Sequence, residues 1–461
     1  MFFKPMLPEL IVVAAALTAL VSQASPRKAA RTVTAGFVLA MIAVLALKGE
    51  SRTYQDGLFV SDAFSATIKT MLLISASFSA VFGADWLTYK RFSRGEYAAL
   101  LAFSVAGMML AVSANNFLTL FLGLEAMQMP LIFLTAYKRH GERSTEAGVK
   151  SVLAMLISSG LFLFGVSVIY VCSGTTDFSQ IASADKTAAM PALLVGVSFM
   201  TAGFLVKTGV SPFHLWLPDV YEGAPAPVTA FYGTTVRLGV LSAFARVVVV
   251  PFGDMGFYWK PVLEAAALLS VFGGALGLLV QTNIKRFAAY AVVMTNGFAV
   301  AAAATGGFAV FVLFIGINTV LLTGLFAVML SLRVGGDLSE ELKTLKGQGR
   351  ANAERGALFS LVFLGLLGLP PLAGFWAYFA VWKAGFESGA AIVVALLAIG
   401  NILPAYVFLK IVRQMYFFEA SDDLNPAPEP MKIAIVLSAA TSVFLPFFLG
   451  DLGHLIQQTV W

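Results

Sequence analysis

Long apolar runs, separated by short polar segments, cover the chain from end to end. The runs are near twenty residues long and centre near residues 15, 39, 73, 104, 125, 160, 201, 238, 269, 294, 320, 368, 400 and 440. At about 1.5 Å of helix rise per residue, each can cross a hydrocarbon layer of about 30 Å. A transmembrane barrel would instead show alternating segments of about ten residues. The pattern predicts an all-α polytopic membrane protein with about 14 transmembrane helices.

The polar connections between the runs are short. Only residues 331–355 form a substantial charged loop, and the next largest connection is 413–432. We therefore expect a single transmembrane domain over 1–461. The composition agrees, because 59% of the residues are hydrophobic and 12% are charged, whereas soluble domains are about 25% charged.

The first apolar run allows two interpretations. Lys4 precedes it, and VSQAS near its end resembles a signal-peptide cleavage site. However, Pro8 and Glu9 stand where the apolar region should begin. A cluster of cations, Arg27 to Arg31, follows directly, as at the cytoplasmic end of a retained helix. We interpret the run as the first membrane span.

The Lys and Arg residues are distributed unevenly between the two faces that alternate connections would occupy. Of 30 cations, 20 fall on one face and eight on the other. By the positive-inside rule, the richer face is cytoplasmic and both termini lie on the opposite side. The net charge of +5 therefore reflects topology. There is no basic domain for nucleic acid.

The two remaining cations, Lys207 and Arg237, lie inside apolar runs, and Glu125 has about eleven span residues on each side. Each charge costs roughly 2.5–3.5 kcal/mol at the bilayer centre, so we expect the three to face protein or water and to pair with one another. One interpretation is an ion pair that only orients helices. The other is proton transfer, because a desolvated lysine loses its proton more readily and a buried glutamate holds one longer.

Two of the runs are interrupted by proline. Ser211-Pro212 breaks LVKTGVSPFHLWLPDVYEGAPAPVTA, residues 205–230, and Pro370-Pro371 breaks LGLPPLAGFWAYFAVWKAG, residues 367–385. Proline removes a backbone hydrogen bond, and freed backbone groups persist at membrane depth only beside protein or a wet cavity. Interrupted helices in two halves of a transporter indicate an ion path built from inverted repeats.

The stretch LVKTGVSPFHLWLPDVYEGAPAPVTAFYGTTVRLGVL resembles the subunit N family of respiratory NADH:quinone oxidoreductase, complex I. The resemblance extends through GLEAMQMPLI, NIKRFAAYAVV and GLPPLAGF. It implies a proton-translocating subunit of the bacterial inner (plasma) membrane, with both termini periplasmic. It implies no cofactor bound by this chain, with NADH, FMN, iron–sulfur clusters and quinone in partner subunits. The implied neighbours are the antiporter-like subunit M and the small subunits K and J, together with lipids.

The resemblance also implies a domain plan. Two inverted five-helix repeats, each with a broken helix, are expected at 96–252 and 257–413. A three-helix segment at 1–95 precedes them, and a C-terminal helix at 431–461 follows.

Four site residues follow from the family motifs. Glu125 matches the glutamate of the fifth helix, and Lys207 matches the lysine of the broken seventh helix. Arg237 stands where a lysine of the eighth helix is usual, and a guanidinium cannot give up its proton in a relay, although it can set the field. Tyr378 falls where the family has a lysine of the broken twelfth helix, and a phenol is no cation. These departures put the second half-channel in doubt.

The other candidate site residues each allow two interpretations. Lys383 lies about 140° around an ideal helix from Tyr378, and it either snorkels to the outer surface or serves the proton exit. His214 and Asp219 either shuttle protons at the cytoplasmic mouth or stabilise the break. Lys285, in the NIKR motif, is either a topological cation or a relay member.

Polar residues in the later spans could hold ordered water or simply pack helices. They are Tyr290, Thr295, Asn296, Asn318 and Asn401. The single Cys172 allows no internal disulfide, and no metal-cluster motif occurs.

Two alternative functions stay open at this point. One is a subunit of a cation/proton antiporter or of a related membrane-bound hydrogenase-type complex. The other is a purely structural wedge in the complex. The wording PDVYEGAPAPVTA favours subunit N over the antiporter, and Glu125 with Lys207 argues against an inert wedge.

Overall fold

The computed structural model describes residues 4–22, 25–47, 52–54, 57–91, 95–138, 141–187, 189–420, 424–448 and 450. Among these, eleven helical segments are long and apolar enough to cross a membrane. They are Pro26–Ala46, Ala63–Tyr89, Phe117–Thr135, Glu142–Ser173, Met190–Thr208, Ala226–Val249, Gly253–Val280, Ile284–Thr305, Gly307–Ser331, Ala391–Phe417 and Glu429–Phe448. The prediction of an all-α polytopic membrane protein is confirmed.

Fewer described helices are long enough to span a membrane than the about 14 spans predicted, for two reasons. The apolar helices α1 (Leu7–Val21) and α4 (Glu96–Val112) are shorter than the rest. The run centred near residue 368 is divided into α16 (Ala353–Leu367) and α17 (Ala373–Glu387).

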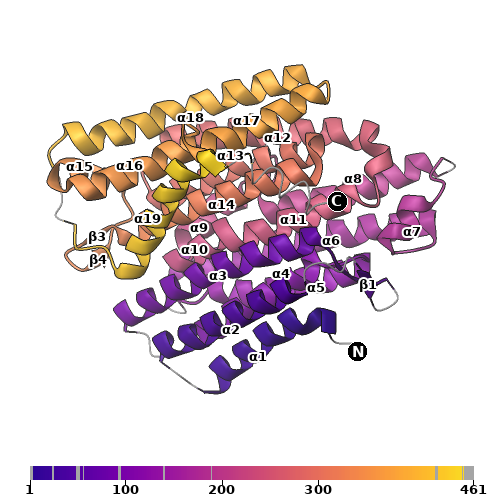
Figure 1. The fold of residues 1–461 in the computed structure, drawn as a ribbon, viewed down its shortest axis with the longest axis horizontal. Helices are drawn as coiled ribbons and strands as arrows, with labels where there is room; N and C mark the ends of the chain where they lie inside the picture. Colours follow the sequence, from indigo (N-terminus) through magenta and orange to yellow (C-terminus); the bar gives the residue numbers. More distant parts are fainter. Residues whose placement is uncertain are drawn as a thin grey trace.

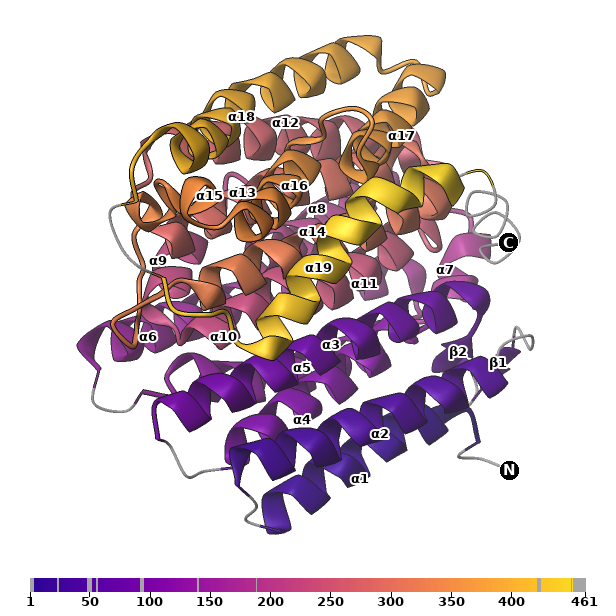
Figure 2. The same ribbon diagram turned by 60° about the vertical axis from the view of Figure 1, so that its left-hand side comes forward.

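The helices pack in a layered bundle. The N-terminal α1, α2 (Pro26–Ala46) and α3 (Ala63–Tyr89) form one flank, and α17 and α18 (Ala391–Phe417) lie on the opposite side (Figure 1). The helix α19 (Glu429–Phe444) runs obliquely between these groups (Figure 2).

Two helical segments form the innermost part of the described bundle. The segment of α10 (Ala226–Phe231), the π-helix η2 (Tyr232–Val236) and α11 (Arg237–Val249) is completely enclosed, and α13 (Ile284–Thr305) is nearly so. The helices α12 (Gly256–Val280) and α14 (Gly307–Ser331) pack against α13. A charge on the inner segments is therefore remote from lipid, and it must find its partners within the protein.

Two short hairpins lie at opposite ends of the bundle (Figure 1). The strands β1 (Arg52–Tyr54) and β2 (Phe59–Ser61) are at one end, near α7 (Phe178–Ser183), and β3 (Arg333–Val334) and β4 (Asp337–Leu338) are at the other. Both pairs are antiparallel. The predicted charged loop 331–355 contains β3, β4, η4 (Leu342–Leu345) and α15 (Gln348–Ala351).

The charged loop is fixed to the ends of neighbouring helices. The Arg333 guanidinium lies 2.6 Å from the Asp85 carboxylate of α3, and Lys90 Nζ lies 2.8 Å from Asp337. The Ile284 amide donates to the Glu340 carbonyl oxygen over 2.8 Å. The longest polar connection is thus an ordered cap on this end of the bundle.

Both predicted helix breaks are present, and they have the same backbone form. The helix α8 (Met190–Thr208) ends at Gly209 with φ +65°, and α9 (Trp216–Gly223) follows after the proline. The helix α16 ends at Gly368 with φ +80° before α17. Glycine adopts this left-handed conformation without steric cost, which explains where each helix stops. Each predicted repeat range contains one of these breaks.

Two further cations, Lys69 and Arg246, are buried within helices and paired with acids. Lys69 lies within α3, with Nζ 2.6 Å from Glu9 Oε1 of α1. Arg246 lies within α11 and forms two hydrogen bonds of 2.8 Å to the Asp62 carboxylate. Burial alone raises the pKa of Asp62, but the guanidinium outweighs burial and lowers that pKa from 3.8 to about 2.

Candidate functional site

A charged pair lies at the end of α8, where that helix meets α5 (Phe117–Thr135). Lys207 Nζ is 3.9 Å from Glu125 Oε1, and it donates a hydrogen bond to Gln128 Oε1. Glu125 Oε1 accepts a hydrogen bond of 2.5 Å from Ser159 of α6 (Glu142–Ser173). Glu125 and Gln128 are three residues apart and therefore share one face of α5. The helices α5, α6 and α8 together place one cation and one carboxylate side by side.

The two members of the pair differ in exposure. The Lys207 side chain is 3% exposed, whereas that of Glu125 is 23% exposed. A separation of 3.9 Å is longer than a hydrogen bond, so proton transfer between them needs a side-chain rotation or a bridging water. Lys207 instead donates a hydrogen bond to the neutral Gln128, and Glu125 accepts one from the neutral Ser159. The pair is coupled electrostatically without a direct hydrogen bond.

Arg237 does not join this ion pair, contrary to the expectation that the three buried charges pair with one another. Its Nε donates to Asn296 Oδ1, and Asn296 Nδ2 donates to the Thr208 carbonyl oxygen over 2.7 Å. Within the described part of the chain, Nη1 and Nη2 have no hydrogen-bond partner. The reason is positional, because Arg237 begins α11 at the π-helix and Asn296 stands between it and the end of α8. π-Helical turns frequently occur at functional sites.

Two carbonyl groups in the last turn of α8 have side-chain donors. Trp216 Nε1 donates to the Val206 carbonyl oxygen over 3.0 Å, and Asn296 serves that of Thr208. The predicted candidate His214 lies in the turn itself, half-buried, with Nδ1 2.8 Å from Ser211 Oγ. The α8 side of the break is thus stabilised, and His214 takes part in the hydrogen bonding of the turn.

Asp219 and Lys285 are held in a polar network at the end of the bundle with the charged loop. Asp219 lies 2.7 Å from Lys150 Nζ and 2.9 Å from Arg286 Nη1. Lys285 Nζ lies 2.7 Å from Glu340 and donates to two backbone carbonyl oxygens, over 3.0 and 3.2 Å. An ammonium group has three hydrogens, so these partners occupy Lys285 fully. Its contacts join the start of α13 to the end of α9.

The second break presents a different set of side chains. The Tyr378 hydroxyl donates to the Leu366 carbonyl oxygen over 3.0 Å, and the ring is almost completely buried. Ring centroids of Phe298, Phe314 and Trp382 lie 4.6, 5.6 and 6.3 Å from that of Tyr378. Tyr378 therefore closes the break and fills an aromatic cluster.

Lys383 lies away from this cluster. Its side chain is 64% exposed, and its Nζ is 3.7 Å from Glu387 on the same helix. The structure therefore places it on the surface of the bundle.

The sequence of this chain is similar to those of known membrane proteins. Residues 114–403 match the profile of the NADH:quinone oxidoreductase/Mrp antiporter transmembrane family. The chain is 34% identical over 459 residues to NADH-quinone oxidoreductase subunit N of Paramagnetospirillum magneticum, covering 96% of this chain and 94% of the relative. It is 36% identical over 402 residues to subunit N of Granulibacter bethesdensis, covering 85% and 84%. The chain belongs to the subunit N family of NADH-quinone oxidoreductases.

Solved structures place this subunit N family member in a wider fold group. A chain of respiratory complex I from Thermus thermophilus, solved with bound aureothin, superposes with a TM-score of 0.84 at 25% identity and 98% coverage of both chains. A chain of the Mrp complex from Dietzia superposes with a TM-score of 0.85 at 20% identity, covering 100% and 98%. The second match shows the shared fold alone.

One polar feature of this subunit N family member escaped sequence reasoning. The Tyr232 hydroxyl lies 2.8 Å from Ser151 Oγ and 3.0 Å from Thr135 Oγ1, all three buried. Thr135 is seven residues beyond Gln128 on α5, about 10.5 Å along the helix. Isolated hydroxyl residues in apolar helices carry no signal of their own. Only packing shows that these three hydroxyls meet in one buried hydrogen-bonded group.

Metal ligation is not part of the described site. Across the residues given above as described, no group of three or more His, Cys, Asp or Glu side chains could hold a metal ion.

Proposed function

We propose that this chain carries protons across a bacterial plasma membrane as a non-redox subunit of an NADH-quinone oxidoreductase. NADH, FMN, iron–sulfur clusters and quinone then belong to partner subunits. The observation that carries the proposal is the Glu125–Lys207 pair, 3.9 Å apart beside a broken helix, with Lys207 buried and Glu125 partly exposed. A buried acid and base at this distance bias each other's protonation, which is the property that a proton relay needs.

The geometry supports a simple cycle for the pair. When Glu125 is close to Lys207, its negative charge favours the protonated lysine, and when the two separate, the lysine releases its proton more easily. Glu125 is the more exposed member, so a charge on a neighbouring subunit can act on it first. Arg237 holds a fixed positive charge near the end of α8 and opposes double protonation of the site.

A proton supply route is proposed along the buried hydroxyl chain. The hydroxyls of Ser151, Tyr232 and Thr135 can each accept one proton and donate another. The route begins at Ser151, the residue after Lys150, and Lys150 binds Asp219 in the polar network. Ordered water is needed to cover the remaining distance to Gln128 and Lys207.

The orientation and neighbours are part of the same proposal. The end of the bundle that carries the charged loop is cytoplasmic, and both termini are periplasmic, because that end holds most of the cations. The proposed neighbours are the antiporter-like subunit M and the small subunits K and J. The proposed repeats span 96–252 and 257–413, because each of these ranges contains one broken helix.

A cation/proton antiporter subunit is the main competing function. Its fold is shared, since a chain of the Mrp complex from Dietzia superposes with a TM-score of 0.85. Identities of 32–36% to relatives named NADH-quinone oxidoreductase subunit N, over most of the chain, favour the oxidoreductase. Sodium-dependent transport without any NADH-dependent activity in the assembled complex would support the antiporter instead.

The proposal is tested by Glu125→Gln in the assembled complex. The amide keeps the size of the side chain but cannot ionise, so we expect proton transfer through this site to slow by about 100-fold. NADH-driven acidification of membrane vesicles measures the effect, and a native gel checks assembly. The matched control is Glu354→Gln, because Glu354 also lies near a lysine, at 3.7 Å, but the pair is exposed. Normal proton pumping by Glu125→Gln would exclude the relay.

A further inference from the structure

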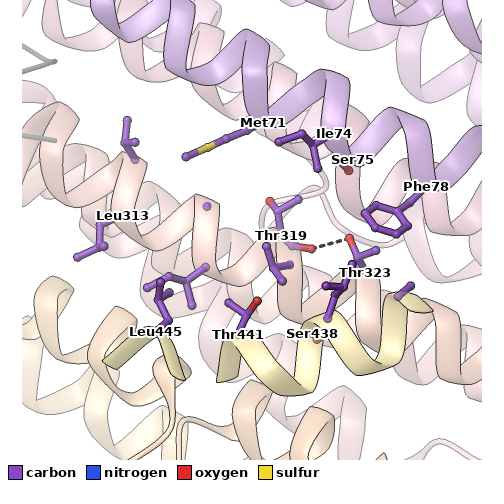
Figure 3. Close-up of a pocket in the computed structure, with 16 residues that line it drawn as sticks. Met71, Ile74, Ser75, Phe78, Leu313, Thr319, Thr323, Ser438, Thr441 and Leu445 are labelled. Carbon is purple, nitrogen blue, oxygen red and sulfur yellow. Dashed lines mark hydrogen bonds between the residues drawn. The ribbon is translucent and has the colours of Figure 1, made fainter. Parts of the chain in front are cut away.

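Two cavities follow one another along α3 and α19. One has a volume of about 250 Å³ and lies between α3, α14 and α19 (Figure 3). The other has a volume of about 910 Å³ and lies between α2, the last part of α3 and the start of α19. We call the two together the α3–α19 groove.

The same stripe of each helix lines both cavities. On α3 the stripe runs through Ile74, Phe78, Val81 and Asp85, at spacings of three or four residues that keep one helix face. On α19 the lining residues are Pro430, Ala434, Leu437, Ser438, Thr441 and Leu445, with the same spacing. The two cavities therefore lie end to end along this face of α3, although no residue lines both. From Met71 to Asp85 this face extends about 21 Å.

The two ends of the groove differ in chemistry. The smaller cavity is lined almost wholly by apolar atoms (Figure 3). Of its polar lining residues, Thr319 and Thr323 bond to carbonyl oxygens of their own helix, and Ser75 bonds to Thr235. The larger cavity is lined by Arg27 and Arg31, both exposed. A narrow apolar track thus leads to a cationic mouth.

The polar mouth retains unused hydrogen-bonding capacity. Within the described part of the chain, the buried Thr34 hydroxyl in this cavity has no hydrogen-bond partner. Of the two acids in the lining, Asp85 is paired with Arg333 at 2.6 Å, which leaves Glu429. Two arginines against one free carboxylate leave the mouth with a net positive charge. An anion with several acceptor oxygens would satisfy both guanidinium groups and the hydroxyl.

We propose that the α3–α19 groove is a binding site for an anionic membrane phospholipid. The phosphate lies between Arg27, Arg31 and Thr34, and one acyl chain follows the track towards Thr319. A length of about 21 Å suits one leaflet, since half of the hydrocarbon core is about 15 Å and the headgroup region adds several more. Because Arg27 and Arg31 belong to the cation-rich face, the lipid comes from the cytoplasmic leaflet.

The dimensions favour a lipid over a transmembrane helix of a partner subunit. A helix about 10 Å wide with a pitch of 5.4 Å fills roughly 420 Å³ per turn. The apolar cavity, at about 250 Å³, is smaller than one such turn. A single acyl chain is narrow enough to enter it.

The test uses the assembled complex in phosphatidylcholine vesicles that contain phosphatidylglycerol with a photoreactive diazirine in its acyl chain. We expect labelled peptides from α3 and α19. Each arginine near an anionic headgroup contributes about fivefold in binding, equivalent to about 1 kcal/mol. The double variant Arg27→Gln with Arg31→Gln should therefore reduce labelling of these peptides by about 30-fold.

Two further variants separate charge from shape. Lys28→Gln is the matched control, because Lys28 is exposed between the two arginines but does not line the cavity. It should change labelling by less than about fivefold, the value for one direct arginine contact. Ile74→Trp fills the apolar track without changing charge, so it should reduce labelling of α19 while Arg27 and Arg31 stay in place. A native gel confirms that each variant assembles.

Competition decides the source of the ligand. Unlabelled phosphatidylglycerol should displace the probe, whereas free inorganic phosphate should not. Equal labelling by a zwitterionic phosphatidylcholine probe, or unchanged labelling in the double arginine variant, would overturn the proposal. So would a specific cross-link between Leu437→Cys and another subunit, because a partner helix would then occupy the groove.

Discussion

The two broken helices of this chain solve the same backbone problem with different side chains. In both, a glycine with positive φ ends the first half, and a buried side chain donates to a carbonyl oxygen that the break frees. At α8–α9 these donors are Trp216 and Asn296. At α16–α17 they are Tyr378 and Asn401, which reach the carbonyl oxygens of Leu366 and Leu367.

The surroundings of the two breaks differ far more than the breaks themselves. Beside the first lie Lys207, Glu125 and, through Asn296, the guanidinium of Arg237. Beside the second lie aromatic rings packed on Tyr378. A break therefore does not by itself identify a proton-carrying site. In this chain the titratable groups that meet at a break are concentrated in the first half.

The most disruptive way to test this contrast is Tyr378→Lys, which places the usual family lysine in the second half. The site that receives this lysine is an almost closed aromatic cluster. An unpaired buried charge costs about 3–5 kcal/mol, so we expect a large loss of assembled complex on a native gel. A stable, active variant would instead mean that water reaches the second break.

The next largest effect is expected for Lys207→Arg, which preserves the charge of the first half but prevents deprotonation. We expect proton pumping to fall by about 100-fold, as for a lost acid–base group. Vesicle acidification measured together with quinone-coupled NADH oxidation gives both readouts. Lys207→Ala should be equally impaired. Parent-like pumping by Lys207→Arg alone would show that Lys207 acts only as a fixed charge.

The contrast also shows what the sequence could predict. Hydrophobic run lengths and proline positions were enough for the all-α membrane fold and for both breaks. The proximity of Glu125 and Lys207 followed from the cost of isolated charges in a membrane. Contacts set by helix packing could not be predicted this way. Gln128 was missed although it lies one turn from Glu125, because an amide has no charge to draw attention.

For Arg237 the sequence predicted a position within the membrane but not the side chain that binds it. Sequence spacing placed it in the membrane, but its partner is the Asn296 side chain rather than Glu125. Which face of α11 meets α13 depends on the π-helical turn of η2, and that turn shifts the register of every following residue. The buried pairs Lys69–Glu9 and Arg246–Asp62 depend similarly on where helices begin and end.

A smaller effect is expected at Arg237, which connects to the first break through Asn296. Arg237→Ala removes a fixed positive charge and leaves Asn296 without that donor, so we expect about a tenfold loss of coupled turnover, equivalent to about 1.4 kcal/mol. Because like-charge repulsion is lost, the pH profile of turnover should move to higher pH. Arg237→Lys keeps the charge and should stay within about threefold of the parent. An unchanged pH profile in Arg237→Ala would reduce Arg237 to a packing role.

The smallest effect distinguishes a structural hydroxyl from a carrier in the second half. Tyr378→Phe keeps the aromatic cluster and removes only the hydrogen bond to the Leu366 carbonyl oxygen. Because that carbonyl group is left unsatisfied, we expect a loss of about 1 kcal/mol in stability, seen as a fall in melting temperature of about 2 °C or less. Pumping should be unchanged. The control is Tyr406→Phe, because the Tyr406 side chain is exposed and should show neither effect. If Tyr378→Phe assembled normally but pumped poorly, the hydroxyl would belong to a proton path, and the two breaks would be functionally alike despite their different surroundings.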